Sequence, residues 1–194
     1  MKITSIGILF CCLAFAACNN PDKHALAKET ERDTTAVLKA SYPQEFYDSL
    51  SAALEAYYDL SEALVKADTG LADGHAKQMK QHMDSLPFHV IANDSIRVEQ
   101  LKAASGDISA ELLGLSLENT GIEARRADYQ VVSDMLYEFI RATGIKGQTV
   151  YRQYCPMAFD DRGAYWLSKT PGIHNPYFGD AMPDCGSTTD TLKY

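Results

Sequence analysis

The feature that most constrains the fold of this chain is a series of four apolar stripes between residues 46 and 140. In each stripe apolar side chains recur every three or four residues, which places them on one face of an α-helix. The stripes run from Phe46 to Leu64, from Ala72 to Leu86, from Ile96 to Leu115 and from Tyr129 to Ile140. Asp94 is the expected N-cap of the third helix. Because the connections are short, we predict an antiparallel up-down four-helix bundle over residues 44–146.

The segment that follows, residues 147–188, has a different composition. Aromatic and β-branched residues in "QTVYRQYC" predict a short strand near residues 149–154. Prolines and glycines are frequent from residue 171 onward, which predicts irregular backbone. Four aromatic side chains would attach this arm to the bundle: Tyr165, Trp166, Tyr177 and Phe178. The expected fold class is therefore mainly α, one domain with an irregular, aromatic-rich C-terminal arm and a tail at 189–194.

The N-terminal residues predict export and attachment to a membrane surface. An apolar run lies within residues 1–17, which has the length of a signal peptide and is too short for a membrane span. The "FAAC" that ends at Cys18 resembles the lipobox of bacterial lipoproteins. That resemblance implies a lipidated Cys18 on the periplasmic face of the envelope, with the outer membrane favoured, and residues 18–43 as a polar tether. Plain secretion with a free Cys18 is the alternative.

Two cysteines, Cys155 and Cys185, remain once the leader and Cys18 are set aside. They enclose 29 residues. In an oxidising compartment such a pair is typical of a structural disulfide, worth roughly 3 to 4 kcal/mol through loop entropy. Each cysteine also has a methionine close by in the sequence, so a metal site is the other interpretation, and both stay open.

The metal interpretation depends on soft sulfur ligands. Cys155 and Met157 are two residues apart, so they share one face of an extended backbone, and a turn can bring Met182 next to Cys185. His174 lies between the two pairs as a possible further ligand. Cu(I) and Ag(I) prefer thiolate and thioether ligands, so copper(I) or silver is the expected ion.

The C-terminal motifs also suggest a family. In order, "YCPMA", "GAYWLS", "NPYFGDAM" and "CG" resemble a bacterial domain of unknown function. That domain is found alone in small periplasmic lipoproteins and fused to periplasmic adaptor subunits of copper- and silver-type heavy-metal efflux pumps. The resemblance implies soft-metal buffering or delivery, with an efflux adaptor or a periplasmic metal chaperone as partner.

A second candidate metal site lies on the second predicted helix, at His75, Met79 and His82. The two histidines are seven residues apart, about 10.5 Å along a helix, so each could share an ion only with Met79. Met79 and Met83 also fall on the apolar stripe, which favours a core position instead.

Charge and motifs narrow the classes of function. The formal charge of −8 disfavours nucleic acid as a partner. The sequence contains no nucleophile elbow, phosphate loop or His-Glu-x-x-His motif, so we expect no enzyme. A thiol oxidoreductase is disfavoured because Cys-x-x-Cys is absent. The alternative to metal binding is a disulfide-stapled interaction module of the envelope. "RRADY" at residues 125–129 is expected on a solvated helix face or at a docking patch for an acidic partner.

Overall fold

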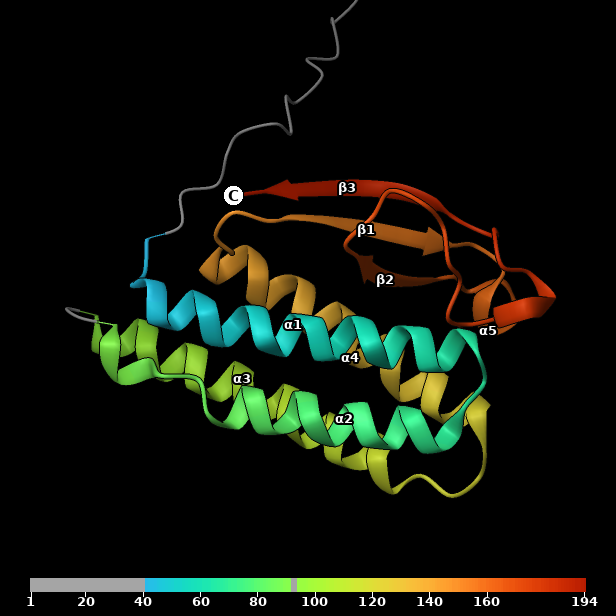
Figure 1. Ribbon diagram of the computed structural model, residues 1–194, viewed down its shortest axis with the longest axis horizontal. Helices are drawn as coiled ribbons and strands as arrows, with labels where there is room; N and C mark the ends of the chain where they lie inside the picture. The colour runs from blue at the N-terminus through green and yellow to red at the C-terminus, as the bar shows by residue number, and fades with distance from the viewer. Residues whose placement is uncertain (1–40, 92–93) are drawn as a thin grey trace, which may run out of the picture. The chain divides into compact units, whose positions relative to one another are not determined.

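The computed structural model describes residues 41–91 and 94–194, which form a mainly helical structure with a small antiparallel sheet (Figure 1). The elements in chain order are α1 (Gln44–Val65), α2 (Thr69–Asp84), the 3-10 turn η1 (Phe88–Val90), α3 (Ser95–Leu117), α4 (Ile122–Thr143), β1 (Thr149–Cys155), α5 (Ala158–Asp161), β2 (Ala164–Ser168), η2 (Gly179–Ala181) and β3 (Ser187–Lys193). The expected signal peptide, the lipidated Cys18 and the tether up to residue 40 lie outside the described residues.

The four apolar stripes form the four long helices, as predicted. Asp94 caps α3 by accepting a hydrogen bond from the backbone N–H of Arg97 at 2.9 Å, which confirms the predicted start of that helix. Asp68 caps α2 in the same way through Leu71. At the other end of the series, α4 stops at Gly144, whose φ of +73° is readily adopted by glycine.

The long helices lie side by side in chain order (Figure 1), with α1 packed on α2, α2 on α3 and α3 on α4. Leu50, Leu54 and Leu136 are fully buried between them. Met79 and Met83 are also buried, at 0% and 1% exposure, so the core interpretation of these methionines is confirmed. Among the helices of the described ranges, none has both the length and the apolar character that crossing a membrane requires.

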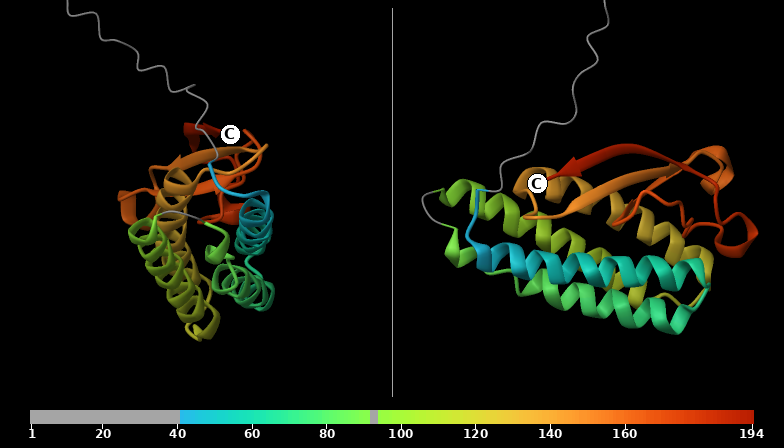
Figure 2. Two further views of the ribbon diagram at one scale, coloured as in Figure 1. Left: turned by 90° about the vertical axis from the view of Figure 1, so that its left-hand side faces the viewer. Right: turned by 45° about the horizontal axis from the view of Figure 1, so that its top comes forward.

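β1 confirms the short strand expected near residues 149–154, and residues 169–186 contain only the short 3-10 turn η2, in agreement with the predicted irregular backbone. The C-terminal arm also contains β2 and β3, which were not predicted. It forms a three-stranded antiparallel sheet in the order β2-β1-β3, with Gln153 opposite Trp166 and Arg152 opposite Asp190. Figures 1 and 2 show the sheet lying over α1 and α4, away from α2 and α3. The strand β3, "STTDTLK", escaped prediction because only its Leu192 is buried, which leaves no apolar alternation to detect.

Tyr57 of α1 joins the sheet to the helices. Its hydroxyl accepts a hydrogen bond from the backbone N–H of Leu167 in edge strand β2, at 3.0 Å. The same hydroxyl lies 2.8 Å from the Ser133 hydroxyl of α4. Its ring stacks on that of Tyr129 with 5.2 Å between centroids. Burial raises the pKa of Tyr57 to about 12, so this side chain stays a neutral hydrogen-bonding group at physiological pH.

Arg152 attaches the central strand β1 to α4. Its guanidinium lies between the rings of Tyr137 and Tyr165, 4.0 and 3.9 Å from their centroids. It also pairs with Asp134 of α4 at 3.0 Å. Stacking and ion pairing together use both the flat faces and the edge of the guanidinium, which suits Arg and not Lys.

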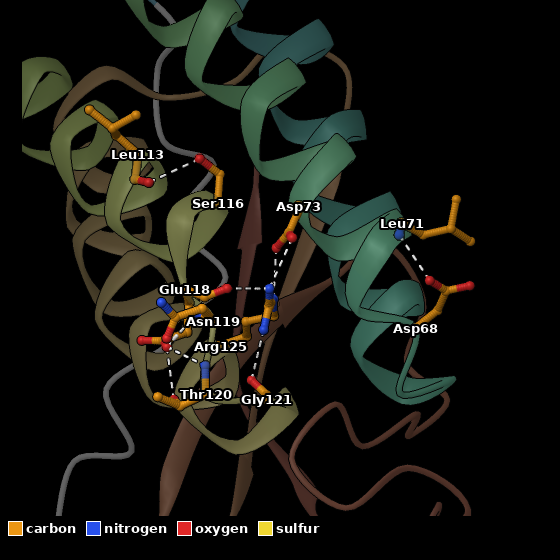
Figure 3. A network of polar contacts seen from close by, with 10 residues as sticks. All are labelled: Asp68, Leu71, Asp73, Leu113, Ser116, Glu118, Asn119, Thr120, Gly121 and Arg125. Carbon is orange, nitrogen blue, oxygen red and sulfur yellow. Dashed lines mark hydrogen bonds and ion pairs between the residues drawn. The ribbon is translucent and has the colours of Figure 1, made fainter.

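Arg125 is buried at 5% exposure, so the expectation that "RRADY" forms a solvated or docking face is wrong for this residue. Its guanidinium forms two bonds to Asp73 of α2, at 2.7 and 2.9 Å. It also donates to the carbonyls of Glu118 and Gly121 in the α3–α4 connection (Figure 3). The bidentate pair raises the pKa of Arg125, and the residue fastens the connection to α2.

Candidate functional site

The fold brings Cys155 and Cys185 into contact. Cys155 ends β1 and has no exposed surface, whereas Cys185 precedes β3 and is partly exposed. Their sulfur atoms are 2.8 Å apart. A disulfide requires about 2.05 Å. Two thiolates about 2.3 Å from one shared ion would be about 3.8 to 4.6 Å apart. The pair, here called the dithiol, can therefore become either a disulfide or a two-sulfur metal site through small side-chain movements.

Gly186 allows the chain to reach this position. Its φ is +147°, and a Cβ atom there would lie 2.8 Å from Trp166 and 2.9 Å from the Tyr154 carbonyl oxygen. Any larger residue would displace the backbone that carries Cys185. The "CG" pair thus has a steric reason: the glycine lets its neighbouring cysteine approach β1.

Asn175 organises the loop before Cys185. Its side chain is fully buried, donates to the Cys185 carbonyl at 2.8 Å and accepts from the Tyr177 N–H at 2.8 Å. Its backbone N–H donates to the Pro183 carbonyl at 3.0 Å. Sequence reasoning did not single out Asn175, although its place before a proline is a known turn signal.

Arg126 fixes the same loop to the helices and is buried at 7% exposure. It donates to the Pro176 carbonyl at 2.8 Å, to the Leu64 carbonyl at 3.1 Å and to the Glu123 carboxylate at 2.7 Å. Arg126 therefore joins the loop, the end of α1 and the start of α4. It too is not on a solvated face, contrary to expectation.

Met157 and Met182 line one pocket beside the dithiol. The pocket, here called the methionine pocket, has a volume of about 440 Å³ and is lined by Glu123, Met157, Ala158, Phe159, Asp160, Tyr177, Phe178 and Met182. The cysteines do not line it. They are connected to it through the backbone, because Met157 follows Cys155 by two residues and the Cys185 N–H donates to the Met182 carbonyl at 3.3 Å. The four predicted sulfur residues thus lie in one region, as two adjoining pairs.

The wall of the methionine pocket contains a left-handed turn, α5. Phe159, Asp160 and Asp161 have φ values of 54°, 57° and 61°. Such a conformation costs roughly 1 to 2 kcal/mol per residue for residues with a Cβ. Three in succession are held in place by the surrounding packing, as occurs at functional sites.

Cys185 keeps its proton at neutral pH when the dithiol is reduced and empty. The neighbouring Cys155, together with burial, raises the pKa of Cys185 above its usual value of 9.0, while the Met157 N–H opposes this. A metal ion must therefore displace a proton from Cys185 to bind there.

The histidine candidates lie away from the dithiol. His174 is 70% exposed, lies 3.5 Å from the Glu62 carboxylate of α1 and borders a different pocket of about 180 Å³. His75 and His82 are half-buried on α2, and Met79 between them faces the core. Within residues 41–91 and 94–194, no three or more His, Cys, Asp and Glu side chains come together as a group that could hold a metal. Two cysteines and two methionines would not count as such a group, because methionine is not one of these four residue types.

Comparison with known families gives a match over most of the helical region. No curated protein and no solved structure matches the chain. Residues 53–148 match the model of a family described as "Protein of unknown function (DUF3347)", in agreement with the expected domain of unknown function. The motifs from "YCPMA" to "CG" lie after residue 148, so the match includes most of the long helices and does not include the dithiol.

Proposed function

We propose that this protein binds a soft monovalent metal ion, Cu(I) or Ag(I), at the dithiol. The observation that carries the proposal is the 2.8 Å approach of the Cys155 and Cys185 sulfurs, with Met157 and Met182 lining the pocket next to them. Thiolate and thioether sulfurs are the ligands that such ions prefer.

The surroundings of the dithiol suit a soft ion. Cys155 is fully buried and Trp166 covers the backbone beside Cys185, so water is a poor competitor for the ion. Binding through both sulfurs releases their protons and leaves a single negative charge on the complex. Protonation of the thiolates weakens binding, so the ion can be released again, which suits a protein that takes up an ion and passes it on.

The proposed setting is the bacterial envelope. The leader and the lipobox-like "FAAC" support a lipoprotein anchored at Cys18 on the periplasmic face, with the outer membrane favoured. The long helices would serve as an up-down four-helix bundle, a scaffold without catalytic activity. The resemblance of the C-terminal motifs to efflux-associated domains supports buffering of the ion or its delivery to a heavy-metal efflux adaptor.

A competition titration tests the proposal. The reduced full chain is titrated anaerobically with Cu(I) against a chromogenic Cu(I) chelator. We expect one equivalent to be withheld from the chelator, and Cys155→Ser and Cys185→Ser each to lower the affinity at least 100-fold. His174→Ala is the matched control, because it removes a possible metal ligand that lies away from the dithiol. The Cu(I) affinity of this variant should stay within threefold of wild type. Equal copper binding by wild type and Cys185→Ser would refute the proposal.

A disulfide-stapled interaction module is the second candidate function. The same 2.8 Å sulfur contact and the complete burial of Cys155 support it, because a disulfide needs only a slight approach of the two sulfurs. Thiol counting with intact mass on protein isolated from a periplasm distinguishes the two. A blocked pair that takes up no copper even after reduction favours the staple.

A further inference from the structure

We infer that the methionine pocket is an outer site for the soft ion, separate from the dithiol, which takes the ion from solution and passes it inward. This inference rests on the proposed function of the dithiol. It differs from a single site of four sulfurs because Met157 and Met182 share a pocket that Cys155 and Cys185 do not line.

The two methionines of the pocket differ from those of the core. Met157 is 47% exposed, and Met182 is partly exposed. Met79 and Met83, by contrast, are at most 1% exposed. Other large apolar side chains, such as Ile96 and Leu117, are more exposed than Met157, so exposure alone does not distinguish it. What distinguishes Met157 is that it lines the same pocket as a second methionine, Met182. A thioether that reaches solvent at the mouth of a pocket can contact an arriving ion directly.

The other walls select for a soft cation. Phe159, Tyr177 and Phe178 contribute aromatic rings, which attract cations of low hydration. Asp160 and Glu123 add negative charge, and Glu123 is partly neutralised by its bond to Arg126. Hard ions such as Mg²⁺ demand several oxygen ligands and keep their waters, so two thioethers and three rings suit them poorly.

The route from the pocket to the dithiol is short. Met157 follows Cys155 by two residues, and the Met182 carbonyl accepts from the Cys185 N–H at 3.3 Å. In the transfer step the ion leaves the thioethers, both thiols release their protons to solvent, and the ion ends between two thiolates. No electron is transferred. The direction is favourable because thiolates bind Cu(I) and Ag(I) more tightly than thioethers do.

The left-handed turn keeps the pocket formed without the ion. Ala158, Phe159 and Asp160 line the pocket, and they belong to the turn whose positive φ values other packing must hold. Ala158 is buried at 1% exposure, and the Phe159 ring packs edge-on against Tyr177 at 5.4 Å between centroids. A preformed pocket avoids the cost of ordering its ligands when the ion arrives.

Silver(I) is the probe, because it stays in one oxidation state and can be added without a reductant. Four full-chain variants are compared: Cys155→Ser/Cys185→Ser, Met157→Leu/Met182→Leu, the combination of all four changes, and Met135→Leu. Met135 is a matched control because it is partly buried and lines a groove between α3 and α4, away from the dithiol. Leu for Met nearly conserves side-chain volume, and circular dichroism verifies the fold.

We expect the double serine variant to bind one Ag(I) at least 100-fold more weakly than wild type. The methyl NMR signals of Met157 and Met182 should shift on binding, and the combined variant should bind none. Met157→Leu/Met182→Leu should keep its equilibrium affinity within threefold, yet load the dithiol at least fivefold more slowly in stopped flow. Met135→Leu should behave as wild type.

Three results would overturn the inference. In the first, the double serine variant binds no Ag(I). In the second, the combined variant binds Ag(I) as tightly as the double serine variant. In the third, Met157→Leu/Met182→Leu loses as much equilibrium affinity as the double serine variant. The last result would mean one joint site. Failure of the proposed function gives a different pattern, in which wild type binds Ag(I) no more tightly than the double serine variant.

Discussion

Arg126 should hold the loop before Cys185 in place, and Arg126→Met tests this. The substitution removes donors from the Pro176 and Leu64 carbonyls, at 2.8 and 3.1 Å, while the methionine retains part of the packing. The buried Pro176 carbonyl would lose its partner, which costs about 1 to 3 kcal/mol, whereas the Leu64 carbonyl still accepts from the Ala67 N–H at 3.2 Å. The bond to Glu123 adds little because that carboxylate is 75% exposed. We expect the free energy of unfolding to fall by about 1 to 3 kcal/mol.

The neighbouring Arg125 supplies the matched control. It is equally buried and forms four hydrogen bonds, but these go to α2 and to the α3–α4 connection. Arg125→Met should destabilise the protein by a similar amount in urea unfolding. Only Arg126→Met should also speed alkylation of Cys185 in the reduced native protein, by at least fivefold. If both variants speed alkylation equally, the reactivity reports general unfolding, and the argument for local attachment is refuted.

Further predictions concern Gly179, the pH dependence and the methionines. Gly179→Ala should destabilise by about 2 kcal/mol or more in urea unfolding, because φ is +52° and a Cβ would overlap the Val65 carbonyl oxygen; an unchanged midpoint would contradict this. Since the pKa of Cys185 is raised, apparent Ag(I) affinity should rise between pH 6 and 8 by about tenfold per pH unit for each proton released, and a flat profile in competition titrations would show that no thiol proton is displaced. The pKa of Cys185 is higher in the folded reduced protein than in the unfolded chain, so the protonated thiol stabilises the fold at pH values below the pKa of the unfolded chain. This contribution to the free energy of unfolding should be lost as the pH rises through the pKa of Cys185 in the folded protein, which chemical unfolding at pH 7 and pH 10 can test. Met79→Ala should cost about 2 to 5 kcal/mol because Met79 is fully buried, whereas Met157→Leu should change stability by less than about 1 kcal/mol in the same assay.

The helices could be predicted because their signals are local. An apolar side chain every three or four residues determines which face is buried, and Asp94 marks a helix start through its own side chain. Gly144 marks a helix end because glycine readily adopts its φ of +73°. None of these signals needs knowledge of distant residues.

The sheet could be predicted only in part because its signals are not local. β1 has β-branched and aromatic residues and was expected, but β3 is polar and exists through its pairing with β1. Edge strand β2 is satisfied by the Tyr57 hydroxyl of α1, a partner 110 residues away in sequence. Arg125 and Arg126 were misassigned for the same reason, since most of their partners are the Asp73 carboxylate and backbone carbonyls of other segments, which the sequence does not reveal.

The sequence predicted the sulfur residues of the candidate site but not the residues that position them. Residue type and spacing singled out Cys155 and Cys185, and the fold brings their sulfurs into contact. The roles of Asn175 and Gly186 depend on how the loop crosses β1, which only the folded chain defines. The division of the sulfurs into a dithiol and a methionine pocket likewise could not be derived from spacing.

X-ray absorption at the copper edge tests the central claim most directly. The reduced full chain is loaded anaerobically with one equivalent of Cu(I), and the ligand atoms around copper are determined. The account predicts sulfur neighbours at about 2.3 Å, contributed by Cys155 and Cys185 and lost in the double serine variant. Nitrogen and oxygen neighbours alone, or a spectrum that the serine substitutions leave unchanged, would contradict it.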